Sequence, residues 1–133
     1  MSAPVPRRPQ DFAAAFESIH IPVFHLTGTE DNSPLGDTKA GDRRAAFDHM
    51  TGAETCLLIF NGGDHMVFSG TPRLNKGTDQ IFQDLICHST TAFWEAYLND
   101  NGNARDWLLD GGFKAELKEN GSFETKHPVA KRK

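Results

Sequence analysis

The chain has 133 residues, of which 38% are hydrophobic and 24% charged, and its formal net charge is −4. This length and composition are typical of one soluble globular domain, and the negative charge argues against nucleic acid or an anionic membrane as the main partner. No segment approaches the ~20 consecutive apolar residues that a membrane-spanning helix needs.

The first half of the chain alternates expected helices with expected strands. A helix is predicted at residues 11–19, with Asp11 as the candidate N-cap. The segments "IPVFHLTGT" (residues 21–29) and "ETCLLIF" (residues 54–60) are nearly continuous in apolar residues, as in parallel strands that are covered on both faces. Between them, residues 37–50 predict a weaker helix that Gly41 interrupts.

The second half is expected to be mainly helical. Residues 78–98 predict one long helix, because apolar or small residues recur along one face at Ile81, Leu85, Ile86, Ser89, Phe93 and Ala96. A short helix is predicted at residues 104–109. Residues 113–126 contain two alternating runs around Asn120-Gly121, which predicts a hairpin. Residues 127–133 are expected to form a flexible basic tail.

The order of these elements predicts an α/β fold. Strands that alternate with helices indicate a parallel sheet with right-handed crossovers. Two or three strands are few for such a sheet, since about four to six are common. Residues 1–133 are therefore expected to be the C-terminal part of a single domain that is truncated at its N-terminal side. As written, the chain is expected in the cytoplasm, but a secretory signal could lie upstream of a truncated chain.

Two polar residues stand in matching places after the two predicted strands. Asp31 follows Gly28 and His65 follows Gly62, each three residues after the glycine. Ligands of parallel sheets bind at the carboxyl ends of the strands, and one helical crossover would put these two ends side by side. A carboxylate there could fix the imidazole tautomer and stabilise the imidazolium. Asp31 and His65 are therefore the candidate acid and base of one site.

Each candidate also has an ordinary explanation. Aspartate often caps loops, and a histidine in a loop is often only solvated. A metal site made from His20, His25, His65 and Asp31 is disfavoured. His20 and His25 are five residues apart, and residues at this spacing on a strand face opposite sides. His49, His88 and His127 are expected at the surface or in helix packing, without a role in the site.

The two cysteines, Cys56 and Cys87, both lie among apolar residues and are expected to be buried, reduced thiols, although a disulfide between them stays open. Asp64 could tune the pKa of the neighbouring histidine, but a turn-forming role is favoured. Met66 and Phe68 either line an acyl pocket or pack beneath the loop, and packing is favoured.

The segments "IPVFHLTGTEDNSP" (21–34), "GGDHMVFSG" (62–70) and "TTAFWEAYL" (90–98) resemble the C-terminal part of the α/β-hydrolase superfamily, in its branch of predicted dienelactone hydrolases and related esterases. The resemblance extends from about residue 2 to residue 126. It implies that Asp31 is the triad acid, that His65 is the triad base, and that the helix at residues 78–98 packs on the sheet after the histidine.

The chain departs from this family in one respect. The family's nucleophile lies in a G-x-S-x-G elbow upstream of the acid and the histidine. The six serines are Ser2, Ser18, Ser33, Ser69, Ser89 and Ser122, and none has glycines two residues before and two residues after it. The resemblance therefore implies a fragment of a serine carboxylic-ester hydrolase that carries the acid and the histidine and is inactive alone.

The expected substrate is a small-molecule ester, and no cofactor or metal is expected. Which ester it is and how many copies of the chain assemble stay open. The alternative is a non-catalytic α/β binding or interaction domain. That alternative is disfavoured because two or three strands would leave a sheet edge and an apolar face uncovered.

Overall fold

A three-stranded mixed sheet forms the middle layer of the computed structural model, which describes residues 12–33, 36–70, 73–74 and 76–128. The strands are β1 (Val23–Gly28), β2 (Thr55–Phe60) and β3 (Gly121–Lys126), in the order β1-β2-β3. β1 and β2 are parallel, with Val23 opposite Thr55, whereas β2 and β3 are antiparallel. The parallel pair confirms the predicted crossover.

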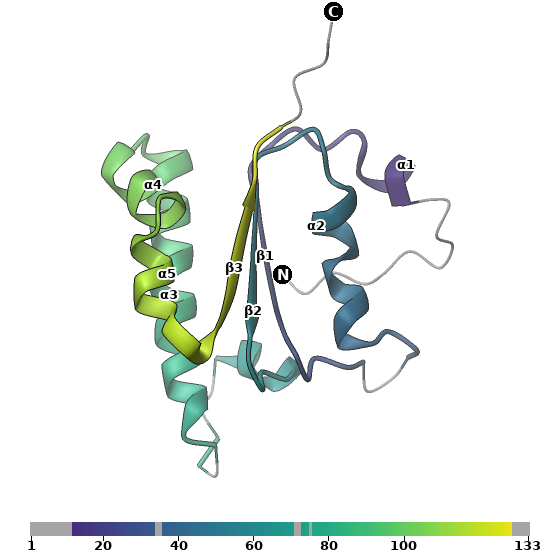
Figure 1. Ribbon diagram of the computed structural model, residues 1–133, viewed down its shortest axis with the longest axis vertical. Helices are drawn as coiled ribbons and strands as arrows, with labels where there is room; N and C mark the ends of the chain where they lie inside the picture. Colours follow the sequence, from purple (N-terminus) through teal and green to yellow (C-terminus); the bar gives the residue numbers. More distant parts are fainter. Residues whose placement is uncertain (1–11, 34–35, 71–72, 75, 129–133) are drawn as a thin grey trace, which may run out of the picture.

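Helices cover both faces of this sheet (Figure 1). On one face lie α1 (Phe12–Phe16) and the crossover helices η2 (Ala40–Arg44) and α2 (Ala45–His49), and on the other lie α3 (Thr78–Leu98), α4 (Gly102–Leu109) and α5 (Gly112–Leu117). Two further 3-10 helices, η3 (His65–Ser69) and η4 (Lys118–Asn120), follow β2 and α5. The result is a three-layer α/β/α arrangement.

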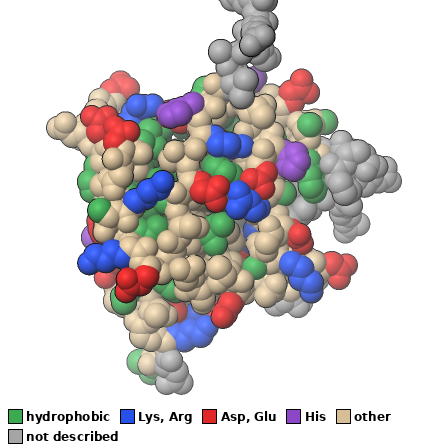
Figure 2. Space-filling view, in the orientation of Figure 1, with side chains coloured by type: hydrophobic (Ala, Val, Ile, Leu, Met, Phe, Trp, Pro, Cys, Tyr) green, Lys and Arg blue, Asp and Glu red, His purple; other side chains and the backbone are tan. Residues whose placement is uncertain are grey.

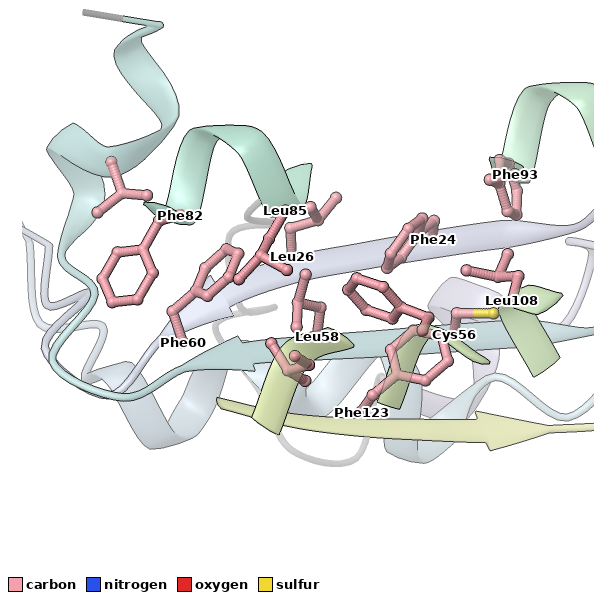
Figure 3. Close-up of a cluster of buried hydrophobic side chains, with 13 residues drawn as sticks. Phe24, Leu26, Cys56, Leu58, Phe60, Phe82, Leu85, Phe93, Leu108 and Phe123 are labelled. Carbon is pink, nitrogen blue, oxygen red and sulfur yellow. The ribbon is translucent and has the colours of Figure 1, made fainter. Parts of the chain in front are cut away.

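The main core lies between the sheet and α3, α4 and α5 (Figure 3). Alternate residues of each strand face this layer, because successive side chains of a strand point to opposite faces. Phe60 of β2 stacks on Phe82 of α3, with ring centroids 4.6 Å apart. The buried cluster comprises Phe24, Leu26, Cys56, Leu58, Phe60, Val67, Phe82, Leu85, Phe93, Leu108, Phe113, Leu117 and Phe123.

The long helix has the predicted bounds, but its buried face differs slightly. Leu85, Ser89, Phe93 and Ala96 are buried, as expected. Ile81, however, is 46% exposed, and Phe82 occupies the core in its place. The predicted N-cap Asp11 and residues 129–133 of the basic tail lie outside the described residues.

The predicted hairpin at residues 113–126 is wrong. Its first run forms α5 and η4, and only its second run forms a strand, β3, which pairs with β2. Phe113 and Leu117 are four residues apart and both buried, which is the spacing of one helical face. The alternation in this run therefore concealed a helical pattern.

The two cysteines differ from each other. Both are free thiols, but only Cys56 is buried, and Cys87 on α3 is exposed, contrary to the prediction. No helix in the described part of the chain is both long and apolar enough to cross a membrane.

Candidate functional site

The loop after β1 (residues 29–33, the acid loop) and the loop after β2 (residues 61–70, the histidine loop) lie side by side. The Glu30 N–H donates a hydrogen bond to the Gly63 carbonyl oxygen at 2.9 Å. A Cβ atom on Gly28 would lie only 2.1 Å from the same oxygen. Only glycine therefore allows the two loops to approach this closely.

Asp31 and His65 meet at the carboxyl ends of the two parallel strands. His65 Nδ1 lies 3.0 Å from Asp31 Oδ1. The Asp31 side chain is completely buried, whereas the His65 side chain is 53% exposed. An ionised carboxylate only accepts hydrogen bonds, so a neutral imidazole here carries its proton on Nδ1 and leaves Nε2 as the acceptor. Such a pair can take a proton from a neighbouring group.

Two further side chains of the described residues, Thr27 and Arg43, hold the buried acid. Thr27, on β1, donates a hydrogen bond from Oγ1 to Asp31 Oδ2 at 2.9 Å. Arg43, on η2, donates from Nε to the Asp31 carbonyl oxygen at 2.6 Å. The same Nε atom lies 3.2 Å from Asp31 Oδ1, and the Arg43 side chain is 7% exposed. One carboxylate oxygen thus faces both an imidazole and a guanidinium.

The histidine loop is fixed to the start of α3 by charged groups. Asp64 caps η3 by accepting a hydrogen bond from the Met66 N–H, which agrees with the favoured turn-forming role. The guanidinium of Arg73 binds both Asp64 and Asp79, and Lys76 also reaches Asp64. The hydrogen bond from Arg73 holds the pKa of the Asp64 carboxyl well below its usual range. The histidine therefore stands on a short, well-anchored turn.

Sequence reasoning did not identify Thr27, Arg43 or Arg73 as parts of this site. Thr27 lies on β1, four residues before the acid of the following loop, and its hydroxyl could have been suspected. Arg43 and Arg73 lie in segments of irregular structure or 3-10 helix, where a sequence pattern does not give the direction of a side chain. No motif singles them out.

No hydroxyl or thiol hydrogen-bonds to His65 within the described part of the chain. Ser89 binds carbonyl oxygens of its own helix. Burial raises the pKa of the Cys56 thiol to about 12, so this thiol does not supply a thiolate at neutral pH. The described residues therefore bring an acid and a base together without an activated nucleophile.

His25, Met66 and Phe68 were also considered for a role in or beside the site. His25 is buried on β1, and no group of three or more potential metal ligands is found among the residues that the structure describes. Met66 is 52% exposed, and Phe68 packs against the core, where it also borders an apolar hollow. Phe68 thus packs, as favoured, whereas the exposed Met66 does not pack beneath the loop as expected.

Comparison with known proteins does not assign the chain to a family. No protein-family model matches the chain, and no curated protein matches it. The site is therefore interpreted from its own residues.

Proposed function

We propose that the chain is the acid and histidine part of a serine carboxylic-ester hydrolase of the α/β-hydrolase type. The observation that carries this proposal is the 3.0 Å contact between the buried Asp31 and the half-exposed His65, at the carboxyl ends of two parallel strands. A buried acid behind an accessible imidazole is the arrangement that a triad requires.

In the proposed mechanism, His65 is the general base and then the general acid. Its Nε2 takes the proton from a serine hydroxyl as the serine oxygen attacks the ester carbonyl carbon, and it returns that proton to the leaving alcohol. Asp31 stays ionised, keeps the imidazole in the Nδ1–H tautomer and stabilises the imidazolium. A water molecule then releases the acyl group by the same two proton transfers. The chemistry uses small-molecule esters and no cofactor.

The proposal assigns the nucleophile and the oxyanion hole to polypeptide outside these 133 residues. β1 is an edge strand among the described residues, and its carboxyl end leads directly to the acid loop. A strand added beside β1 would end near Asp31 and His65, because neighbouring strands lie about 4.8 Å apart. This edge is where the proposal places the segment that carries the serine.

The test is to sequence the DNA upstream of the Met1 codon and to express any longer in-frame chain. We expect that chain to contain G-x-S-x-G and to hydrolyse 4-nitrophenyl butyrate. His65→Ala should lower kcat by roughly 10⁴-fold to 10⁶-fold, and Asp31→Asn by about 10⁴-fold. His49→Ala is the matched control, because His49 is exposed, and its ring bonds to the Ala45 carbonyl of its own helix and packs against Phe12 of α1.

Two results would overturn the proposal. One is a longer chain that hydrolyses the ester equally well with and without His65. The other is rapid hydrolysis by the 133-residue chain itself that His65→Ala abolishes, since this chain would then hold its own nucleophile. A stop codon directly upstream of Met1 would instead favour the binding-domain alternative.

A further inference from the structure

Among the residues that the structure describes, Arg43 supplies the fixed positive charge closest to the buried acid. Asp31 is fully buried and the Arg43 side chain is 7% exposed. Taking a carboxylate out of water costs several kcal/mol unless a positive charge is close to it. In the described part of the chain two groups can supply that charge, since Arg43 Nε and His65 Nδ1 both lie within 3.2 Å of Asp31 Oδ1.

These two groups are not equivalent. A guanidinium stays protonated at every pH at which a protein is folded, whereas an imidazole must be neutral before it can accept a proton. If His65 alone balanced the carboxylate, it would hold its proton most firmly as an imidazolium. With Arg43 present, the acid is already balanced, and the imidazole can be neutral without leaving a buried charge unpaired.

We propose that Arg43 is a positioning residue that neutralises Asp31 and thereby keeps His65 available as a neutral base. It acts through Asp31 and does not touch the substrate. Its place in the chain fits this role, because η2 belongs to the crossover that joins the acid strand to the histidine strand. The hydrogen bond from Nε to the Asp31 carbonyl oxygen also fixes the backbone of the acid loop.

The charged groups on the neighbouring elements do not replace Arg43, because the cations among them, Arg73 and Lys76, are bound to Asp64 and the others are carboxylates. On the histidine loop, Asp64 is paired with Arg73 and Lys76. On η2, Asp42 accepts a hydrogen bond from the Lys39 N–H. Glu30 of the acid loop is exposed to solvent. All of these groups stay unchanged in the variants that test the proposal.

The test follows the His65 ring by NMR as the pH is varied, in the 133-residue chain. In Arg43→Met, which keeps the aliphatic stem without the charge, we expect His65 to titrate at least one pH unit higher than in the unmodified chain. This is a tenfold or greater rise in its proton affinity. Arg43→Lys restores the charge and should bring the midpoint back to within about 0.3 units. Amide spectra of the acid loop report whether each variant is folded.

An unchanged midpoint in a folded Arg43→Met variant would overturn the proposal and leave Arg43 a packing role only. If this variant does not fold, Arg43→Gln takes its place, because it keeps a donor for the Asp31 carbonyl and carries no charge. A Gln variant that titrates like the Lys variant would likewise overturn the proposal. The functional role rests on the proposed hydrolase, but the NMR readout involves no hydrolysis, so failure of the two proposals can be told apart.

Discussion

At the scale of single residues, Gly28 decides how closely the acid and histidine loops approach. A Cβ at this position would lie 2.1 Å from the Gly63 oxygen, which is backbone and cannot rotate away. We expect Gly28→Ala to lower the free energy of unfolding by about 3 kcal/mol, because overpacking forces the backbone to shift.

Urea unfolding at neutral pH measures this effect. Gly41→Ala is the matched control, since a Cβ on Gly41 meets nothing within 4 Å. Its free energy of unfolding should stay within about 0.5 kcal/mol of the original or rise slightly. Equal values for the two variants would contradict the account of the loop contact.

His25 is a buried residue that makes stability depend on pH. Burial lowers the pKa of its imidazole to about 4 from the ordinary value of 6.5. Below pH 6.5 the unfolded chain therefore binds a proton that the folded chain does not, so stability is full above pH 6.5 and falls as the pH drops toward 4. The slope is at most about 1.4 kcal/mol per pH unit.

His25→Phe should remove this part of the pH dependence, because phenylalanine keeps a ring beside Phe47 and cannot be protonated. Urea unfolding at pH 5, 6, 7 and 8 measures the free energy of unfolding of the variant and of the original protein. The difference between these two free energies should change between pH 5 and 7 and stay constant between pH 7 and 8. Parallel curves over the whole range would show that His25 does not contribute.

The two residues of the site could be predicted from the sequence, but their supporting residues could not. Asp31 and His65 follow two apolar strands at the same interval, and the parallel crossover brings such strand ends together. Arg43 reaches the acid only because a 3-10 turn in the crossover folds back over it. That path depends on tertiary packing, which local residue patterns do not encode.

At the scale of elements, α4 contributes one fully buried side chain, that of Leu108, to the main core. Leu108 is 0% exposed in the cluster between the sheet and the helices, whereas Leu98, at the end of α3, is 70% exposed. Leu108→Ala should lower the free energy of unfolding by about 2–5 kcal/mol, because it removes buried methyl groups and leaves a cavity.

Leu98→Ala is the matched control, since the same atoms are removed at an exposed place. Leu98→Ala should change the free energy of unfolding by no more than about 0.5 kcal/mol. Thermal or urea unfolding of the two variants measures the contrast. A large loss at Leu98 and a small one at Leu108 would contradict the packing of α4 described above.

The elements differ in how far the sequence determined them. The long helix could be predicted with its bounds, because 21 residues carry a sustained helical pattern. The segment after α4 could not, because six residues of α5 are too few to distinguish a helical spacing from an alternating one. The antiparallel β3 is joined to β2 by long-range pairing, which local patterns do not reveal.

At the scale of the whole molecule, the two edges of the sheet are built differently. β3 carries two charged residues, Lys126 and Glu124, and Glu124 pairs with Arg44. Acidic and basic side chains lie side by side over the middle of the face in Figure 2. Charged side chains of this kind protect an edge from further pairing. β1 has no charged side chain other than His25 when protonated, and five of its six residues are buried. β1 thus has the composition of an internal strand.

An apolar hollow of about 480 Å³ runs along this unprotected edge, lined among others by Ile21, Phe24, Leu26, Met50, Phe93 and Trp94. Ile21 is 70% and Trp94 55% exposed, which is unusual for side chains of this size. The same edge is where the proposed function requires additional polypeptide. The asymmetry of the sheet therefore agrees with a molecule that is completed on the β1 side.

Hydrogen exchange can measure whether β1 is open in the isolated chain. The N–H groups of Val23 and Thr29 donate hydrogen bonds to the β2 side. Because the direction of the N–H groups alternates along a strand, those of Phe24 and Leu26 point away from β2. In dilute solution we expect the Leu26 amide to exchange at least ~100-fold faster than that of His25, which lies on the same strand and faces β2. The comparison within one strand cancels differences in overall stability.

Equal protection of both amides would mean that the edge is already covered. A series of protein concentrations would then show whether a second copy of the chain provides the cover, in which case the protection of Leu26 would fall on dilution.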